Sequence, residues 1–116
     1  MFGRCELVSL KMINLARNEI KEVGDYAFYR VPNVTCIILK ENYIRNITNH
    51  TFAFEKSSDE VLTIDLSTNL IRSEAIARNA FTRLNRPVIL NLHYNLLTYL
   101  GGFFSKFVSI SCGRTT

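Results

Sequence analysis

The segment LKMINLARNEI, residues 10–20, has three further copies in this chain of 116 residues. They are VTCIILKENYI at 34–44, VLTIDLSTNLI at 61–71 and PVILNLHYNLL at 87–97. All four fit L-x-x-L-x-L-x-x-N-x-L, with other apolar residues replacing some leucines. The asparagines of successive copies are 24, 27 and 26 residues apart. A period of this length predicts a stack of repeats, each with one short strand and one returning segment.

Two apolar columns are expected to hold the stack together. Residues spaced by two point to the same side of a strand, so the leucine-type residues at the fourth and sixth positions should face the core. A second column should form on the returning segments, from Phe28, Phe52, Phe81 and Phe104. Each buried phenylalanine contributes about 1.5–3 kcal/mol, so the two columns can keep each turn of the stack closed.

The ninth position of each repeat is an asparagine, and we expect these residues to form a structural ladder. A turn inside a stack leaves backbone groups without water, and an asparagine amide offers two donors and an acceptor to satisfy them. Loss of one such side chain should cost about 1–3 kcal/mol. The ladder consists of Asn18, Asn42, Asn69 and Asn95.

The remaining strand positions should form an exposed concave face. Curved repeat stacks commonly bind their partners there, and mixed apolar, aromatic and charged residues suit a protein partner. The candidate binding residues are Arg17, Ile38, Lys40, Glu41, Asp65, Ser67, Asn91, His93 and Tyr94.

The same face also brings together the residue types of a hydrolase triad. Ser67 and His93 occupy equivalent positions on neighbouring strands, and Asp65 lies two residues before Ser67. A flat parallel sheet provides neither a water-excluding pocket nor evident oxyanion donors, so we predict no catalytic role. The sequence also contains no phosphate-binding glycine loop, no CxxC pair and no histidine pair at metal-ligand spacing, so no cofactor or metal is expected.

With these columns, the chain resembles the extracellular leucine-rich repeats over residues 10 to about 104. The phrases LNRPVILNLHYNLLTYL, FEKSSDE and SEAIARN narrow the resemblance to a group of secreted arthropod proteins labelled oplophorus-luciferin 2-monooxygenase non-catalytic subunit. The resemblance implies an α/β right-handed solenoid of about four repeats, with a parallel sheet on the concave face and irregular or short helical segments on the convex face. It also implies a secreted, non-catalytic accessory or partner-binding role.

The resemblance sets the expected domain boundaries. Residues 1–9 form an incomplete N-terminal edge, the repeats begin near residues 10, 34, 61 and 87 of a domain covering 10–104, and 105–116 form an irregular tail. Secreted members begin with a signal peptide and a cysteine-bearing cap, neither of which is visible here. We therefore expect a fragment of a longer protein. Uncapped ends would expose apolar side chains and favour self-association.

The sequons NVT, NIT and NHT favour an extracellular location, with N-glycosylation predicted at Asn33, Asn46 and Asn49. Cys5, Cys36 and Cys112 are an odd number, and Cys5 and Cys112 belong too far apart in the stack for a disulfide. The net charge of +4 and the absence of a basic aromatic motif predict no nucleic-acid binding. No apolar stretch is long enough for a membrane span.

Two other protein classes stay open from the sequence. The first is a fragment of a receptor ectodomain, which would share both the repeats and the sequons. The second is an intracellular scaffold, which would carry unglycosylated sequons.

Overall fold

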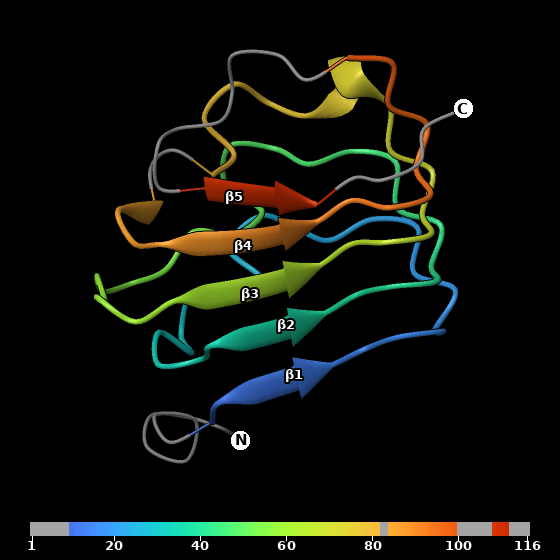
Figure 1. Ribbon diagram of the computed structural model, residues 1–116. Coiled ribbons are helices and arrows are strands. Elements are labelled where there is room, and N and C mark those ends of the chain that lie inside the picture. The colour runs from blue at the N-terminus through green and yellow to red at the C-terminus, as the bar shows by residue number, and fades with distance from the viewer. Residues whose placement is uncertain (1–9, 82–83, 100–107, 112–116) are drawn as a thin grey trace.

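The computed structural model describes residues 10–81 and 84–99, and the backbone of 108–111. Five strands form one parallel sheet in the order β1-β2-β3-β4-β5, and the segments between them return behind the strands (Figure 1). A short 3₁₀ helix, η2 (Ser73–Ala75), lies in the third returning segment. This coiled arrangement is compatible with the predicted solenoid. The strands are β1 (Met12–Asn14), β2 (Cys36–Ile38), β3 (Leu62–Asp65), β4 (Val88–Asn91) and β5 (Val108–Ser111).

The register of the sheet places equivalent repeat positions side by side. Ile37 lies opposite Ile64, and Ile64 lies opposite Leu90. All three are fully buried, as are the leucines two residues further along, Leu39, Leu66 and Leu92. The inward and outward alternation predicted from the repeat therefore agrees with the burial of β2, β3 and β4.

The phenylalanine column closes the other side of the core. Phe28, Phe52 and Phe81 are all at least 95% buried, and their rings stack with centroids 5.7 Å apart at each step. One ring per turn therefore forms a continuous apolar layer that joins the first three returning segments. Phe104, the fourth residue of the predicted column, lies outside the described residues.

The predicted irregular tail over residues 105–116 is wrong at Val108–Ser111, which form β5. This strand pairs with β4 in the same register that β4 keeps with β3. The segment lacks the Leu-x-Leu and asparagine signature, but Val-Ser-Ile-Ser alternates apolar and polar residues as a strand does. Pairing also satisfies backbone groups along β4 that an irregular tail would leave without partners.

Candidate interaction surface

A left-handed residue turns the chain away from the sheet in each repeat. Arg17, Glu41, Thr68 and Tyr94 have φ angles of 59°, 58°, 56° and 61°. Each is the eighth residue of its repeat and directly precedes a ladder asparagine. Side chains other than glycine adopt this conformation at a cost of about 1–2 kcal/mol, so other contacts must stabilise the turn.

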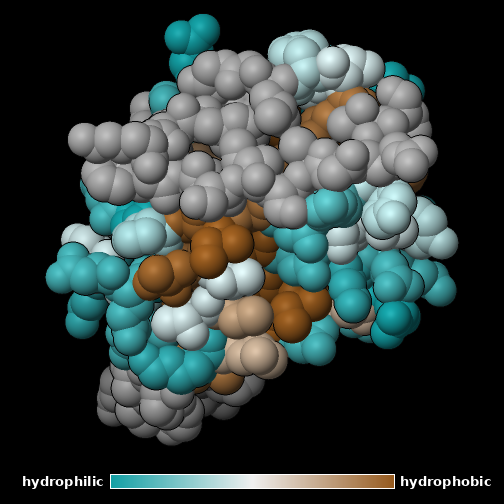
Figure 2. Space-filling model, in the orientation of Figure 1, coloured by the Kyte–Doolittle hydropathy of each residue, from teal (hydrophilic) through white to brown (hydrophobic). Residues whose placement is uncertain are grey.

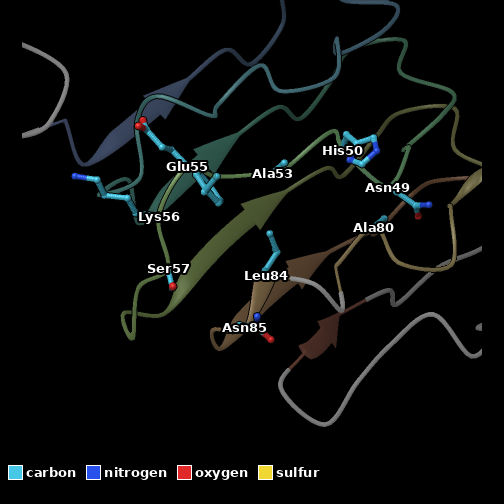
Figure 3. A pocket seen from close by; sticks show the side chains of 10 residues that line it. Asn49, His50, Ala53, Glu55, Lys56, Ser57, Ala80, Leu84 and Asn85 are labelled. Carbon is cyan, nitrogen blue, oxygen red and sulfur yellow. The ribbon is translucent and has the colours of Figure 1, made fainter. Parts of the chain in front are cut away.

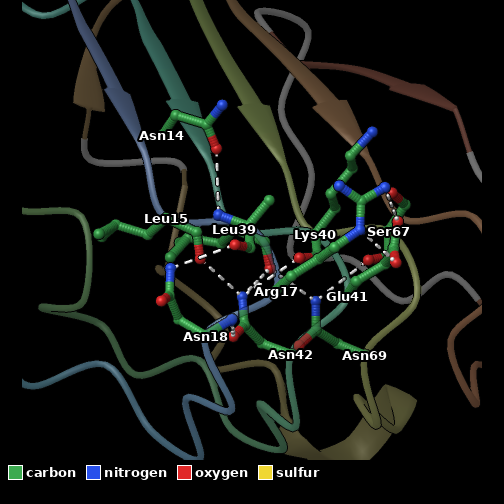
Figure 4. A network of polar contacts seen from close by, with 11 residues as sticks. Asn14, Leu15, Arg17, Asn18, Leu39, Lys40, Glu41, Asn42, Ser67 and Asn69 are labelled. Atoms are coloured by element: carbon green, nitrogen blue, oxygen red, sulfur yellow. Dashed lines mark hydrogen bonds and ion pairs between the residues drawn. The ribbon is translucent and has the colours of Figure 1, made fainter.

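The ladder asparagine provides this stabilisation by bonding to the preceding repeat. The Asn42 amide nitrogen donates to the carbonyls of Leu15 and Leu39 at 3.1 and 2.9 Å. Its side-chain oxygen accepts the backbone N–H groups of Asn18 and Ile20, both at 2.9 Å. Figure 4 shows the bonds of Asn42 to Leu15, Leu39 and Asn18, which join two successive repeats.

Asn69 and Asn95 repeat the pattern, whereas Asn18 does not. The Asn69 oxygen accepts the N–H of Ile44, and the Asn95 oxygen accepts the N–H of Ile71, both at 3.0 Å. Asn42, Asn69 and Asn95 are at least 95% buried. Asn18 is exposed, and the one bond recorded for its amide nitrogen, to the Ala16 carbonyl, lies within its own repeat.

The outer face of the sheet is the main candidate surface, and we call it the sheet face. It contains the outward strand residues and the residues between them and the turn. Its most exposed large side chains are Met12, Ile89 and Tyr94, at 55%, 47% and 63%. Apolar residues gather over the sheet with hydrophilic residues on both sides of them (Figure 2). The side chains of the sheet face that the structure describes are Met12, Asn14, Ala16, Arg17, Cys36, Ile38, Lys40, Glu41, Thr63, Asp65, Ser67, Thr68, Ile89, Asn91, His93 and Tyr94.

The predicted binding residues all lie on the sheet face, although some also serve the fold. Arg17 forms a two-pronged ion pair with Glu41, with N–O distances of 2.9 and 3.0 Å. The Asn91 side chain accepts the backbone N–H of His93 at 3.0 Å and supports the end of its strand. These contacts hold the polar side of the face in place before any partner arrives.

The apparent triad is brought together, but its bonds follow a different order. The Ser67 hydroxyl donates to the Asp65 carboxylate at 2.7 Å, and the same oxygen accepts the Ser67 backbone N–H at 3.0 Å. In a hydrolase triad the serine donates to the histidine, and the aspartate holds the other side of the imidazole. The recorded contacts give Asp65 the role of a turn-forming residue at the end of β3.

The three sequons lie away from the strands. Asn33 and Asn46 are exposed, and Asn49 is half-buried. The Asn49 side-chain oxygen accepts the backbone N–H of Asn79 at 3.0 Å, which joins the second and third returning segments. A glycan would attach to the amide nitrogen, which this bond does not use. Glycosylation at these sites stays a prediction.

Two features of the returning side were not predicted. A cavity of about 270 Å³ lies between residues 49–57 and the residues Ala80, Leu84 and Asn85, and its lining includes His50 and Lys56 (Figure 3). Its residues come from neighbouring repeats outside the recurring columns of the pattern, so no sequence spacing signalled it.

The second unpredicted feature is a buried arginine. Arg86 is 97% buried, and it donates to the carbonyls of Glu60 and Val34 at 2.8 and 3.3 Å. Its guanidinium lies 5.6 Å from the centre of the Phe54 ring. Burial lowers the pKa of Arg86, against an opposing attraction from the Glu60 carboxylate. Arg86 thus links the segments that precede β2, β3 and β4.

The described residues contain no group of three or more metal-ligating side chains. The same part of the chain has no helix long and apolar enough to cross a membrane. Cys36 is a free thiol on the sheet face. Cys5 and Cys112 lie outside the described residues.

Comparison with known proteins agrees with the repeat geometry, since a leucine-rich repeat family matches residues 8–71, more than half of the chain. The chain belongs to the leucine-rich repeat family. Proteins of this family generally act as protein-interaction modules and not as enzymes. The chain is also 27% identical over 132 aligned residues to P-granule-associated novel protein 1 of Caenorhabditis elegans. That alignment covers 92% of this chain but 22% of the nematode protein, so the chain spans about a fifth of its relative. No solved structure matches the chain.

Proposed function

We propose that this chain is a non-catalytic interaction module that binds a protein partner through the sheet face. The observation that carries the proposal is the exposure of Met12, Ile89 and Tyr94 on a face whose backbone is rigidly paired. Apolar and aromatic side chains with a polar rim are typical of the centre of a protein interface. The family's general role as a protein-interaction module supports the same conclusion.

The size of the sheet face limits the affinity of this segment by itself. Five strands about 4.8 Å apart and three or four residues long present a surface of about 250–300 Å². A standard interface buries about 800 Å² on each partner. We therefore propose that the segment contributes part of a larger binding surface, as a piece of a longer repeat protein or as an accessory subunit.

The test compares variants on and off the sheet face. Tyr94→Ala and Ile89→Ser remove exposed side chains from this face, and Tyr99→Ala removes a tyrosine of similar exposure, 54%, from another surface. The immobilised unaltered chain is used to capture proteins from an extract of the source tissue. Any captured protein is then purified and titrated against the unaltered chain and each variant. The proposal requires at least a tenfold loss of affinity for the first two variants and an unchanged value for the third. Equal binding by all three would reject the sheet face as the binding site.

We also propose that the chain is secreted and glycosylated, which separates it from the intracellular scaffold. The exposure of Asn33 and Asn46 supports this, because an attached glycan would not displace core residues. Intact-mass measurement of the native protein before and after removal of N-linked glycans tests the proposal. Loss of sugar mass supports secretion, and an unmodified protein found only inside cells favours the scaffold. A receptor ectodomain fragment would also lose sugar mass, and the flanking sequence would then separate the two by a membrane span.

A hydrolase is the competitor from another functional class, and the Ser67–Asp65 hydrogen bond argues against it, because in a hydrolase triad the serine donates to the histidine. It predicts ester hydrolysis that disappears in a Ser67→Ala variant. An unchanged rate in that variant, or no hydrolysis at all, would exclude it.

A further inference from the structure

Beyond the turn, the chain forms a second surface that the proposed function does not use. After each ladder asparagine, the eleventh residue of the repeat points inward, and Ile44, Ile71 and Leu97 are fully buried. The residues on either side of it, the tenth and twelfth, are exposed or half-buried. The twelfth residues are Lys21, Arg45, Arg72 and Thr98, and the tenth are Glu19, Tyr43, Leu70 and Leu96.

Backbone bonds between repeats set the spacing of this surface. The N–H groups of Tyr43, Leu70 and Leu96 donate to the carbonyls of Ile20, Ile44 and Ile71 at 2.8–2.9 Å. In the best-formed case Arg72 lies directly opposite Leu96 as a parallel bridge. The twelfth residue of one repeat is thus level with the tenth residue of the next, and the backbone positions of successive cations are displaced diagonally by about 7–8 Å.

This geometry places each cation beside an apolar or aromatic side chain of the following repeat. Lys21 is level with Tyr43, Arg45 with Leu70, and Arg72 with Leu96. Tyr43 is 50% exposed, and Leu70 and Leu96 are half-buried. The result is a diagonal row of three positive charges next to a row of apolar groups, which we call the cationic row.

The three cations are exposed, and no ion pair or side-chain hydrogen bond is recorded for them in the described part of the chain. Their backbone is nevertheless held in place. Next to Arg72, the buried Ser73 hydroxyl donates to the Tyr99 carbonyl at 2.9 Å and accepts the Thr98 N–H at 2.8 Å. A row of like charges on a fixed backbone costs stability unless an anionic partner neutralises it.

We infer that the cationic row binds an extended acidic polypeptide segment with carboxylates at alternate positions. An extended chain rises about 3.3 Å per residue, so its alternate side chains are about 6.6 Å apart, close to the diagonal spacing of the cations. The planar fork of arginine pairs with a carboxylate in a two-pronged manner. Apolar residues between the acids would lie against Leu70 and Leu96.

Nucleic acid is a poorer fit to the same row. Glu19 and Glu22 lie beside the first cation in the sequence and Glu74 follows the third, so a longer polyanion would meet negative charge at both ends of the row. The chain carries 14 basic and 10 acidic residues, which gives little net field to attract a nucleic acid. The half-buried leucine side chains also cannot form hydrogen bonds or ion pairs with phosphate groups.

The test titrates the full chain with a labelled peptide of alternating glutamate and valine, about seven residues long, and follows fluorescence anisotropy. The double variant Arg45→Gln/Arg72→Gln removes two charges of the row. Its matched control, Arg30→Gln/Arg78→Gln, removes two exposed arginines elsewhere, and circular dichroism verifies that both variants fold. We expect about tenfold weaker binding for the row variant, little change for the control, and no binding of the glutamine–valine peptide.

Three outcomes would overturn the inference: no binding of the acidic peptide, an equal loss in both double variants, or tighter binding of an oligothymidylate of similar length. An equal loss in both double variants would show that only the net charge of the chain matters, and tighter binding of the oligothymidylate would indicate a nucleic-acid partner. Tyr94 and Ile89 lie on the sheet face, so failure here leaves the proposed function untouched.

Discussion

Replacement of Asn69 by alanine should destabilise the chain by about 2–4 kcal/mol. The substitution leaves the N–H of the fully buried Ile44 without its acceptor, which costs about 1–3 kcal/mol. The carbonyls of Leu39 and Leu66 each lose one of two side-chain donors, at 3.0 and 3.1 Å. Each keeps the other donor, from Asn42 and from Asn95, so their contribution is smaller.

The equivalent substitution in the first repeat provides an internal control. Asn18 is exposed, and its amide nitrogen donates to the Ala16 carbonyl at 3.1 Å. Water can replace that bond, so Asn18→Ala should cost less than about 1 kcal/mol. An asparagine at the same repeat position thus has a different expected loss of stability in the first and third repeats, and the difference of about 2 kcal/mol measures the effect of burying the asparagine.

Urea unfolding of the full chain, followed by far-ultraviolet circular dichroism, measures both values. A lower midpoint for Asn69→Ala with an unchanged slope would give its loss of stability directly. If Asn18→Ala and Asn69→Ala lower the free energy of unfolding by amounts that agree within about 0.5 kcal/mol, the reasoning is refuted, because burial of the asparagine would then not affect stability.

Three further predictions concern stability and use the same unfolding assay. Phe52→Ala should cost about 3–5 kcal/mol and Phe28→Ala less, since Phe52 stacks on two neighbouring rings, and equal costs would contradict this. Thr68→Gly should stabilise the chain by about 0.5–1 kcal/mol by relieving a β-branched residue at φ 56°, whereas Thr68→Ala should not. In Arg86→Lys, the burial that lowers the pKa of Arg86 should also lower the pKa of the lysine. The unfolded state then binds more protons than the folded state, so the free energy of unfolding should rise between neutral and alkaline pH. A flat pH profile would show that the lysine side chain is exposed to solvent.

The repeat pattern predicted the features that recur in every turn. Leucine spacing predicted the buried face of the sheet, and the ninth-position asparagines predicted the residues that now bond between turns. Contacts that occur once were not predictable from a pattern. Arg86 precedes the fourth repeat in the sequence, and only the folded chain brings it to the carbonyl of Val34, 52 residues earlier.

β5 shows a different limit. Its four residues lack the Leu-x-Leu and asparagine signature, and their pairing follows from the needs of the neighbouring strand as much as from their own alternation. The cationic row could not be predicted from the sequence for a related reason. Its members lie one in each of the first three repeats, at a position outside the pattern, and the diagonal displacement that sets their spacing is a property of the backbone bonds.

The asparagine ladder also gives the stack a direction. Each buried asparagine side chain supplies polar groups to the repeat before it, and that repeat supplies only backbone atoms in return. Since every residue has the same backbone, the asparagine does not distinguish which repeat precedes it. Repeats can therefore be duplicated, removed or exchanged during evolution without redesign of the junction, provided that the next one downstream keeps its asparagine. Such interchangeability lets a binding surface lengthen one strand at a time while its outward residues change freely.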